Sequence, residues 1–490
     1  IEVRGQELSG GVPARFQRAF DDVGVPVWLG TTSAFGTSVS AVIPDRDAER
    51  ARARLEDEFR LELGDGTLDR IHVMRGVSLI TLVAEAMGRT PGVLAKLTTA
   101  LGSIGVSVLA MGQSASERSI SCVVAGEDTT RSVQTVHAAF HWAHQEVDVF
   151  LLGPGTVGKE LLEQIHQQQD WLRERHDVKV RLVGLANSRT FLYEQTGLDA
   201  SSARDMLERA EPRPGGLAGP VPDSLLHDLA RHPLPVLVDC TAESGMEVLY
   251  RAAFEAGIHV VAANKKPLTL PSAAYHGLLA EARRRHRAYR YETTVGASLP
   301  VIETLRDLVR TGDEVRLVEG SFSGTLGYIT DELSKGGDLA DIVRRAKEQG
   351  FTEPKPQDDL SGLDAARKAL ILAREIGLEL DLEDVRLEPL VPHKIIEEED
   401  LEAFFHGLAD HASEMKAKVD AARERGEVLR YLARIDPSAR ERGGPMMTVG
   451  PVTVSAENPA AHLRHAQAFV AFYTLRYRDF PLVVQGAGAG

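Results

Sequence analysis

Cysteine is nearly absent from this sequence, and neither a long apolar run nor an excess of basic residues is present. Only two of the 490 residues are cysteine, which excludes a disulfide framework or a cysteine-rich metal site and favours a reducing, cytoplasmic compartment. No uninterrupted apolar run approaches the roughly 18 residues that a membrane span requires, so no membrane partner is expected. The formal net charge of −15 argues against nucleic acid and acidic membranes as general partners.

What is present is the composition of a folded protein with several domains. Hydrophobic residues make up 43% and charged residues 26% of the chain, as in ordinary globular proteins. A chain of 490 residues is too long for a single core and predicts about three domains. The first residue is Ile1 and no signal-peptide pattern follows it, so we expect a fragment or a processed start.

Residues 1–145 contain an internal repeat. Gly24-Val25 aligns with Gly105-Val106, and each copy has the pattern of a helix, a Gly-Val turn, a strand, a short polar turn and a second strand. We therefore predict two small α+β modules, which serve either as a dimerising spacer or as a ligand-binding regulatory unit. The helices are expected at about 12–20 and 93–101, and the strands at 25–29, 37–43, 78–84, 106–110 and 119–124.

An apolar strand followed by a glycine-rich turn opens the next domain. The run Val147–Leu152 ends in GPGTVG, and an amphipathic helix follows. A turn between a strand and a helix is the context of a dinucleotide-binding fingerprint. Its glycines let the backbone approach a pyrophosphate, and the helix N-terminus supplies a positive dipole. The predicted cofactor-binding residues of the turn are Gly153, Gly155, Thr156, Val157 and Gly158.

The next strand indicates which cofactor binds. The strand expected at 178–186 is followed by Arg189 and by no acid that could take a ribose 2′-hydroxyl. Arg189 suits a 2′-phosphate, which favours NADP over NAD. A solvated loop arginine is the simpler alternative.

Two later strands end in polar residues. The strand expected at 236–240 is followed by Thr241, and the strand expected at 260–263 is followed by Asn264 and Lys265. In open α/β sheets, ligands gather at the carboxyl ends of the strands. We therefore expect these three side chains at the cofactor crevice.

The densest group of charges lies in residues 346–368, AKEQGFTEPKPQDDLSGLDAARK. Apolar residues recur at helical spacing from Gly362 to about Ile376. That helix places Asp364 and Lys368 on one face. An exposed salt bridge, worth a few tenths of a kcal/mol, is the simpler interpretation of the pair.

The segment before this helix favours a binding site. Pro354 and Pro356 are expected to interrupt any helix there, and Glu353 and Asp359 lie beside them. A stiff acidic loop followed by a helix with a lysine suits a small zwitterion. The acids would receive its ammonium group, and the lysine would meet its oxygen or carboxylate.

The remaining elements complete a further α/β region. Pro300 is expected in the first turn of a helix, and residues 323–327 are expected to form a turn. The glycine-rich end GAGAG is expected to lie against the cofactor. A long helix is expected at 398–425, and strands at 315–322, 428–433, 446–454, 468–474 and 481–485.

These motifs give the sequence a resemblance to a known family. From about Val147 to Gly490 it resembles the homoserine dehydrogenases, through GPGTVG, ANKKP, YETTVGASLP, GSFSGTLGYI and GFTEPKPQDDLSGLDAARK. With residues 1–145 it resembles the C-terminal part of the bifunctional aspartokinase–homoserine dehydrogenases. The family interconverts L-aspartate 4-semialdehyde and L-homoserine with NAD(P), on the route to threonine, methionine and isoleucine. No kinase motif is present, so no kinase activity is expected of this chain.

The resemblance implies a fold and a division into domains. The expected fold is α/β, with a Rossmann-type NAD(P)-binding domain, an α+β substrate and dimerisation domain, and two preceding ACT-like modules of ferredoxin-like type. The family pairs through its substrate domain, which implies a homodimer or homotetramer. The expected boundaries are 1–145 for the modules, 146–290 for the Rossmann domain, completed by about 460–490, and 291–459 for the substrate domain.

The resemblance also implies roles for individual residues. A positioned ammonium group can stabilise the negative charge that develops on a reduced carbonyl and can deliver the proton. The catalytic residues implied are Lys265, Lys368 and Asp364, with Lys265 as the first candidate for the proton donor. The substrate-binding residues implied are Glu353, Asp359 and Thr325. The ligands implied for a monovalent cation such as Na⁺ are the Glu292 carboxylate and the carbonyl groups of Val295, Ala297 and Leu299.

The second copy of the repeat, VSVLAMGQSASERSISCVV, resembles the ACT regulatory domains of aspartokinases. In those domains a glutamine in this turn binds an amino-acid effector, which implies that role for Gln113 and threonine as the effector. The first copy departs from this pattern, because Thr32 occupies the corresponding position.

Two other functions remain open. The chain could be a non-catalytic amino-acid sensor with a degenerate dehydrogenase half, in which case it would bind threonine without oxidising NADPH. It could also be a semialdehyde dehydrogenase that acts through a cysteine thioester. That chemistry needs an activated thiolate, and Cys240 has no histidine close after it in the chain.

Overall fold

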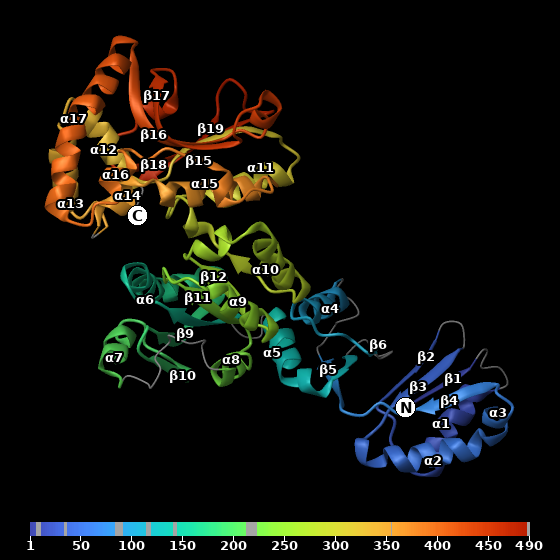
Figure 1. Cartoon of the computed structure of the whole chain (residues 1–490). Helices are drawn as coiled ribbons and strands as arrows, with labels where there is room; N and C mark the ends of the chain where they lie inside the picture. The colour runs from blue at the N-terminus through green and yellow to red at the C-terminus, as the bar shows by residue number, and fades with distance from the viewer. Residues whose placement is uncertain are drawn as a thin grey trace. The chain divides into compact units, whose positions relative to one another are not determined.

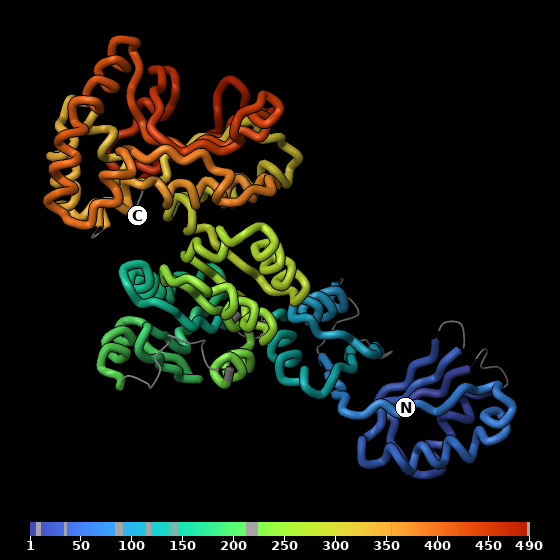
Figure 2. Tube along the Cα trace, in the orientation of Figure 1, coloured from blue at the N-terminus to red at the C-terminus, as the bar shows by residue number. Residues whose placement is uncertain are grey.

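The computed structural model describes residues 1–5, 11–33, 37–83, 92–113, 119–140, 145–211, 223–353 and 355–487. Figure 1 shows their helices and strands, and Figure 2 shows the path of the chain through them. The chain divides into two compact units. The first comprises Ile1–Asp148, Ile165–Arg181 and His227–Pro235, and the second comprises Val149–Gln164, Leu182–Leu226 and Val236–Gly490.

The first unit begins with an antiparallel four-stranded sheet in the order β2-β3-β1-β4. Apolar faces of α1 and α2 pack on it and bury Phe16, Phe20 and Leu55. The elements are β1 (Glu2–Gly5), α1 (Val12–Asp22), β2 (Leu29–Thr32), β3 (Ser38–Val42), η1 (Asp45–Asp47), α2 (Ala48–Glu58), α3 (Arg60–Gly64) and β4 (Leu68–His72).

The second copy of the repeat forms a smaller sheet in the order β5-β7-β6, again antiparallel. Leu97 and Leu101 of α4 and Val136 of α5 pack in one core with residues of β5 and β7. The elements are β5 (Val77–Val83), α4 (Val93–Ser103), β6 (Ala110–Gln113), β7 (Ser119–Ala125), η3 (Gly126–Asp128) and α5 (Thr129–Ala139). The two predicted α+β modules are therefore present.

Each Gly-Val pair of the repeat terminates a helix and does not lead directly into a strand. Gly24 and Gly105 have φ angles of 62° and 72°. In the first copy the Val25 amide donates to the Phe20 carbonyl at 3.0 Å, which is the bond of a Schellman helix end. The chain then needs a connecting segment before it can pair, so the strand starts predicted at 25 and 106 were wrong. The strands β2 and β6 begin at Leu29 and Ala110.

A six-stranded sheet follows in the order β10-β9-β8-β11-β12-β13. From β8 the chain builds β9 and β10 on one side and then returns to place β11 on the other side. In an open sheet, such a reversal is where ligands bind, at the carboxyl ends of the strands. The strands are β8 (Gln145–Leu152), β9 (Val178–Ala186), β10 (Phe191–Leu198), β11 (Pro235–Asp239), β12 (His259–Ala262) and β13 (Tyr289–Arg290), and the helices are α6 (Thr156–His176), α7 (Ala203–Arg209), α8 (Asp223–Leu229), α9 (Met246–Glu255), η4 (Lys266–Thr269) and α10 (Ser272–Arg284).

The rest of the second unit is organised around a sheet in the order β15-β17-β16-β14-β18-β19. Its strands are β14 (Val315–Ser321), β15 (Val385–Leu387), β16 (Glu427–Ile435), β17 (Met447–Ser455), β18 (Gln467–Thr474) and β19 (Leu482–Ala487). Its helices are η5 (Glu292–Thr294), α11 (Val301–Arg310), α12 (Gly324–Ser334), α13 (Leu339–Glu348), α14 (Pro356–Leu360), α15 (Leu363–Glu375), η6 (Leu382–Asp384), α16 (His393–Ile396), α17 (Leu401–Glu424), η7 (Ala439–Arg442) and η8 (Pro459–His462).

The pairing of the last two strands corrects one expectation. β18 pairs with β14, and β19 pairs with β18, so residues 467–487 extend this sheet. We expected residues 460–490 to complete the dinucleotide-binding domain. Those that the structure describes add no strand to the sheet of that domain. The last residues of GAGAG, 488–490, lie outside the described part of the chain.

Three local predictions in this region also need correction. Residues 323–327 form the start of α12, where Ser323 Oγ accepts the Leu326 amide at 3.2 Å as an N-cap. Pro356 does not interrupt a helix but opens α14, because the first helical position needs no amide hydrogen. Pro300 is the N-cap residue of α11, outside its first turn. Pro354 lies outside the described residues.

The longest helix that the structure describes, α17 with 24 residues, is apolar on one face only. Phe404, Leu408 and Met415 are buried, whereas Glu402 and Lys416 are exposed. Among the described helices, none is long and apolar enough to cross a membrane.

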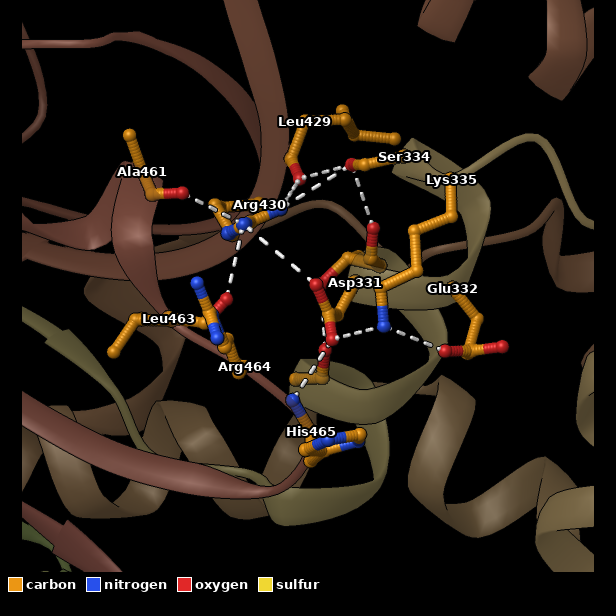
Figure 3. A network of polar contacts seen from close by, with 12 residues as sticks. Asp331, Glu332, Ser334, Lys335, Leu429, Arg430, Ala461, Leu463, Arg464 and His465 are labelled. Atoms are coloured by element: carbon orange, nitrogen blue, oxygen red, sulfur yellow. Dashed lines mark hydrogen bonds and ion pairs between the residues drawn. The ribbon is translucent and has the colours of Figure 1, made fainter.

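A buried arginine of β16, Arg430, ties α12 to η8 and the residue that follows it. Asp331 of α12 lies 3.9 Å from the Arg430 guanidinium and accepts hydrogen bonds from the His465 amide and Lys335 Nζ at 2.8 and 2.9 Å (Figure 3). Thr325, a predicted substrate-binding residue, lies at the start of α12. By fixing α12, this network also holds Thr325 in place. Other acceptors of Arg430, at 2.8 to 3.2 Å, are Ser334 Oγ and the carbonyl groups of Leu429, Ala460, Ala461 and Leu463.

Replacing Arg430 with leucine is expected to destabilise this sheet by about 3 kcal/mol, because several buried carbonyl groups lose their donor. Local opening should then accelerate amide exchange in β16 and β18 by about a hundredfold. Hydrogen exchange read by mass spectrometry on peptides covering 427–435 and 467–474 measures this. The R440L variant, at an exposed arginine, is the matched control. Exchange in R430L as slow as in the control would contradict the expectation.

Candidate active site

The glycine-rich turn is tightly packed at two of its glycines and open at the third. Gly153 ends β8 with a φ of 77°, and a Cβ there would lie 2.8 Å from Thr241 Cγ2. At Gly158 a Cβ would lie 2.3 Å from the Gly153 carbonyl oxygen. At Gly155 it would meet nothing within 4 Å. Packing therefore requires glycine at positions 153 and 158. Gly155 leaves open space at the start of α6, and such a space suits a pyrophosphate. Thr156 and Val157, the other predicted residues, are exposed there.

A buried carboxylate holds the ends of β11 and β12 together. Asp239 is completely buried and accepts hydrogen bonds from the Thr241 amide at 2.7 Å and from Asn264 Nδ2 at 3.2 Å. Tyr250 also donates its hydroxyl to this carboxylate, and burial raises the pKa of Tyr250 far above its usual range. Thr241 and Asn264 are thus fixed at the sheet edge where the cofactor is expected. Asp239 and Tyr250 were missed from the sequence, although an acid at the end of an apolar strand was a usable signal.

Two lysines share one carboxylate. Lys265, which follows β12, lies with Nζ 2.9 Å from Asp364 Oδ1. Lys368, one turn along α15 from Asp364, lies with Nζ 2.6 Å from its Oδ2. Lys368 also donates to the Phe322 carbonyl at 2.7 Å. The structure therefore brings all three predicted catalytic residues together, and we call Lys265, Asp364 and Lys368 the lysine–carboxylate triad.

The charge state of the triad follows from these contacts. Burial would raise the pKa of Asp364, but the charges of Lys368 and Lys265 outweigh burial and lower that pKa to about 2. The folded pKa lies below the usual value of about 3.9 for an unfolded aspartate. The ion pairs therefore stabilise the folded chain at pH values above about 3.9, and this stability is lost as the pH falls through about 2.

A second cluster forms beside the triad. Thr325 Oγ1 lies 2.6 Å from the Phe351 carbonyl oxygen and 3.0 Å from Asp359 Oδ1, so its single proton serves either acceptor. The Glu353 amide donates to Asp359 Oδ2 at 2.8 Å. Burial raises the pKa of Asp359, and the nearby charges of Glu353 and Asp364 add to that effect. The three predicted substrate residues are thus neighbours. Asp359 Oδ2 already has a protein donor, Oδ1 shares the Thr325 hydroxyl with the Phe351 carbonyl, and Glu353 is exposed.

Arg374 links the two segments that carry the lysines. It lies on α15 and is 7% exposed. Its guanidinium donates to the carbonyl groups of Leu268 and Leu270, just after Lys265, at 2.8 and 2.9 Å. It also forms an ion pair with Asp381 at 2.8 Å. Arg374 therefore fixes the Lys265 segment against α15. Sequence reasoning missed it, because an arginine on a helix gives no local sign of partners a hundred residues away.

The predicted cation ligands surround a helix start. The Glu292 carboxylate accepts the Ile302 and Glu303 amides at 2.9 and 3.0 Å, so it caps α11, and burial raises its pKa. Ala297 adopts a φ of 52°. The Leu299 carbonyl accepts the Val301 amide at 2.8 Å. In the described part of the chain there is no group of three His, Cys, Asp or Glu residues that could hold a metal ion.

Two further predicted ligand residues, Arg189 and Gln113, are exposed. Arg189 is exposed in the turn between β9 and β10, where Asn187 Oδ1 accepts its backbone amide at 2.8 Å. Gln113 is exposed at the end of β6, and residues 114–118 of its turn lie outside the described residues.

The second cysteine does not have the environment of a nucleophile. Burial, followed by the neighbouring Asp239 charge, raises the pKa of Cys240 to about 12. Burial also raises the pKa of Cys122, which lies in the core of its module. A thioester mechanism needs a thiolate near neutral pH, so the geometry argues against it.

We expect iodoacetamide at pH 7.5 to leave Cys240 unmodified and any activity of the chain unchanged, because thiolate is almost absent when the pKa lies near 12. Activity and the mass of peptides containing Cys240 are measured together after one hour. The C240S variant is expected to remain active. Loss of activity that follows alkylation of Cys240 would contradict this.

A glycine-rich turn at a sheet reversal and a lysine–carboxylate triad in the same unit are the features of an NAD(P)-dependent oxidoreductase, and two α+β modules precede them in the chain. Known families agree with this class. Residues 153–292 match the family "Homoserine dehydrogenase, NAD binding domain", residues 300–490 match "Homoserine dehydrogenase", and residues 80–140 match "ACT domain". The chain belongs to the homoserine dehydrogenase family and carries an ACT domain, which confirms the expected fold class. It contains no kinase domain.

Three similar proteins place the chain among its relatives. The bifunctional aspartokinase/homoserine dehydrogenase of Haemophilus influenzae is 37% identical over 494 residues, which cover 100% of this chain and 59% of that protein. A solved structure of a Candida auris protein of unknown function is 30% identical, with a TM-score of 0.63, and covers 71% of this chain and 94% of that one. A hyperthermophilic archaeal homoserine dehydrogenase, solved in complex with NADPH, shares the fold at 21% identity and a TM-score of 0.52, with 71% and 93% covered.

Proposed function

We propose that this chain catalyses the NADP(H)-dependent interconversion of L-aspartate 4-semialdehyde and L-homoserine. The observation that carries the proposal is the lysine–carboxylate triad, in which Asp364 lies 2.9 Å from Lys265 and 2.6 Å from Lys368. A sensor without catalytic activity would not need these charges to converge. The family and the glycine-rich turn support the same reaction.

Carbonyl reduction needs a hydride donor and a proton donor. When bound, the nicotinamide cofactor would supply the hydride. Among the described residues the Lys265 ammonium group has one hydrogen-bond partner, Asp364, so two of its three N–H groups remain for a substrate oxygen. Lys368 has only one left, because it also donates to Phe322. Lys265 is therefore the better group to stabilise the developing alkoxide and to deliver the proton.

The cluster beside the triad would hold the amino-acid end of the substrate. The exposed Glu353 carboxylate is available to receive the substrate ammonium group. Asp359 and Thr325 would hold the Glu353 segment in place, since their mutual contacts and the Glu353 amide already occupy the Asp359 carboxylate. A fixed charge pair of this kind orients the aldehyde end for reaction.

The cofactor would bind at the glycine-rich turn, with Arg189 facing a 2′-phosphate. Replacing Arg189 with alanine is expected to raise the KM for NADPH about tenfold through loss of a charge-assisted hydrogen bond, while the KM for NADH stays unchanged. Steady-state kinetics with both cofactors measure this. An equal change for both, or none, would leave Arg189 without a role in cofactor choice.

A monovalent cation such as Na⁺ is part of the proposal. The half-buried Glu292 carboxylate and the carbonyl groups of Val295, Ala297 and Leu299 would be its ligands. The support is chemical, because oxygen donors suit such an ion. The Glu292 carboxylate would have to serve the ion and the α11 amides together.

The direct test is NADPH oxidation at 340 nm with L-aspartate 4-semialdehyde. Succinate semialdehyde, which lacks the ammonium group, is the matched control substrate and should react far more slowly, because the contact with Glu353 is lost. Homoserine should accumulate in proportion to the NADPH oxidised. Absence of turnover in a chain that binds NADPH would refute the proposal.

We also propose an amino-acid effector, with threonine as the first candidate, and assembly into a homodimer or homotetramer. The ACT domain at 80–140 supports an effector. The first unit also contains a cavity of about 370 Å³, lined in part by Trp28, Thr31, His72 and Leu109; Gln113 does not line it. Repeating the NADPH-oxidation assay with added threonine tests the effector. Measuring the molar mass by light scattering tests the oligomeric state. Binding of threonine without any turnover would favour the sensor instead.

A further inference from the structure

A second cavity lies within the second unit, between α10, β13, α11 and α15. Its volume is about 440 Å³. No residue of the lysine–carboxylate triad and none of the glycine-rich turn lines it. The cationic residues that line it are Arg283, Arg287, Arg290, Arg306, Arg310 and Arg374.

These arginines outnumber the carboxylates that face them. Glu303 alone serves three, with distances of 2.9 Å to Arg306, 3.4 Å to Arg290 and 3.6 Å to Arg310. Arg290 and Arg310 are 60% and 62% exposed, and Arg310 has one further, distant contact, to Asp307 at 3.9 Å. The cavity is thus locally positive in a chain with a net charge of −15.

The one carboxylate in the cavity wall is already engaged. Glu375 accepts the Tyr291 hydroxyl at 2.6 Å and the Arg306 guanidinium at 2.7 and 3.0 Å. It therefore cannot neutralise the outer arginines. A bound anion would not have to displace it, because Arg290 and Arg310 do not contact it.

An aromatic wall adds a second, independent observation. Tyr289 lines the cavity, is 8% exposed, and its buried hydroxyl has no hydrogen-bond partner among the described residues. Its ring lies 4.9 Å from the ring of Tyr291, which also lines the cavity. A buried polar atom without a partner indicates a missing ligand or water.

We propose that this cavity binds a small phosphate-bearing anion. A phosphate group offers several acceptor oxygens and more than one negative charge, which match the planar donor forks of several arginines better than a single carboxylate does. The inference does not rest on the proposed dehydrogenase activity, since the two sites share no triad residue.

Calorimetric titration of the full chain with inorganic pyrophosphate tests the proposal. Saturating NADPH is present throughout to occupy the dinucleotide site, and ionic strength is held constant with sodium chloride. We expect one site per chain. The variant R290Q/R310Q, which removes two exposed arginines, should weaken binding about tenfold or more through lost charge-assisted hydrogen bonds.

The R316Q variant is the matched control, because Arg316 is an exposed arginine outside the cavity that pairs with Glu314 at 3.1 Å. Its affinity for pyrophosphate should equal that of the unmodified chain. Absence of binding, binding that disappears at matched ionic strength, or equal affinity in R290Q/R310Q would each overturn the proposal. Failure of NADPH to bind would count against the proposed dehydrogenase function. The comparison of pyrophosphate affinity between R290Q/R310Q and R316Q would still test the cavity.

Discussion

Replacement of Lys265 with alanine is expected to lower kcat for aldehyde reduction by about 10²- to 10⁴-fold, the usual contribution of a positioned proton donor. The side chain has a single protein partner, Asp364 at 2.9 Å. Its loss therefore removes an ammonium group that is free to meet the reacting oxygen. The KM for NADPH should change little, since the only hydrogen-bond partner of the Lys265 side chain among the described residues is Asp364 and not the glycine-rich turn. Steady-state and single-turnover rates at 340 nm measure the effect.

The neighbouring lysine provides the control. Lys266 lies with Nζ 3.1 Å from Ser244 Oγ and has no contact with Asp364 among the described residues. The K266A variant should retain most of the activity. Equal losses in K265A and K266A would show that general charge, and not the triad, is responsible. Unchanged turnover in K265A would remove Lys265 from the proton-donor role.

The second large effect is expected at Asp364. The D364N variant keeps the shape of the side chain but leaves two ammonium groups beside each other without a counter-charge. We expect kcat to fall by about a hundredfold or more, because a preorganised charge arrangement is lost. The alkaline limb of the pH–rate profile should also move to lower pH, because like charges make it easier to remove a proton from the pair. In the unmodified chain Asp364 has a pKa of about 2 and does not titrate in this range.

The shift of the pH profile separates a catalytic from a structural role. A variant that is merely less stable would lose activity at all pH values alike. Asp358, an exposed acid on α14, provides the matched control, and D358N should keep both rate and profile. A D364N variant with normal kcat and an unshifted profile would contradict the role assigned to the triad.

Local sequence patterns predicted part of this site correctly. The helix expected from Gly362 to about Ile376 is α15, Leu363–Glu375, and it places Asp364 and Lys368 on one face. The strand, glycine turn and helix around Gly153 also follow from spacing alone. These features depend on neighbours in sequence, which helical and strand periodicity reveal.

Other parts depend on contacts that no local pattern carries. Lys265, the second lysine that contacts Asp364, lies 99 residues earlier in the chain. Its position after a strand placed it at the cofactor crevice, but only the family resemblance put it in one site with Asp364. Arg374 donates hydrogen bonds to the carbonyl groups of Leu268 and Leu270, which lie more than a hundred residues earlier in the chain. Such pairings are set by tertiary packing. The start of α12 at Gly324 was missed for a different reason, because a Ser-Gly segment is typical of turns and also of helix N-caps.

The most direct test of the account uses NADPH in which both hydrogens at C4 of the nicotinamide are replaced by deuterium. The unmodified chain is incubated with this cofactor and L-aspartate 4-semialdehyde, and the product is analysed by mass spectrometry and NMR. The account predicts L-homoserine with one deuterium at C4. Homoserine without deuterium, or no homoserine from a chain that binds both ligands, would contradict it.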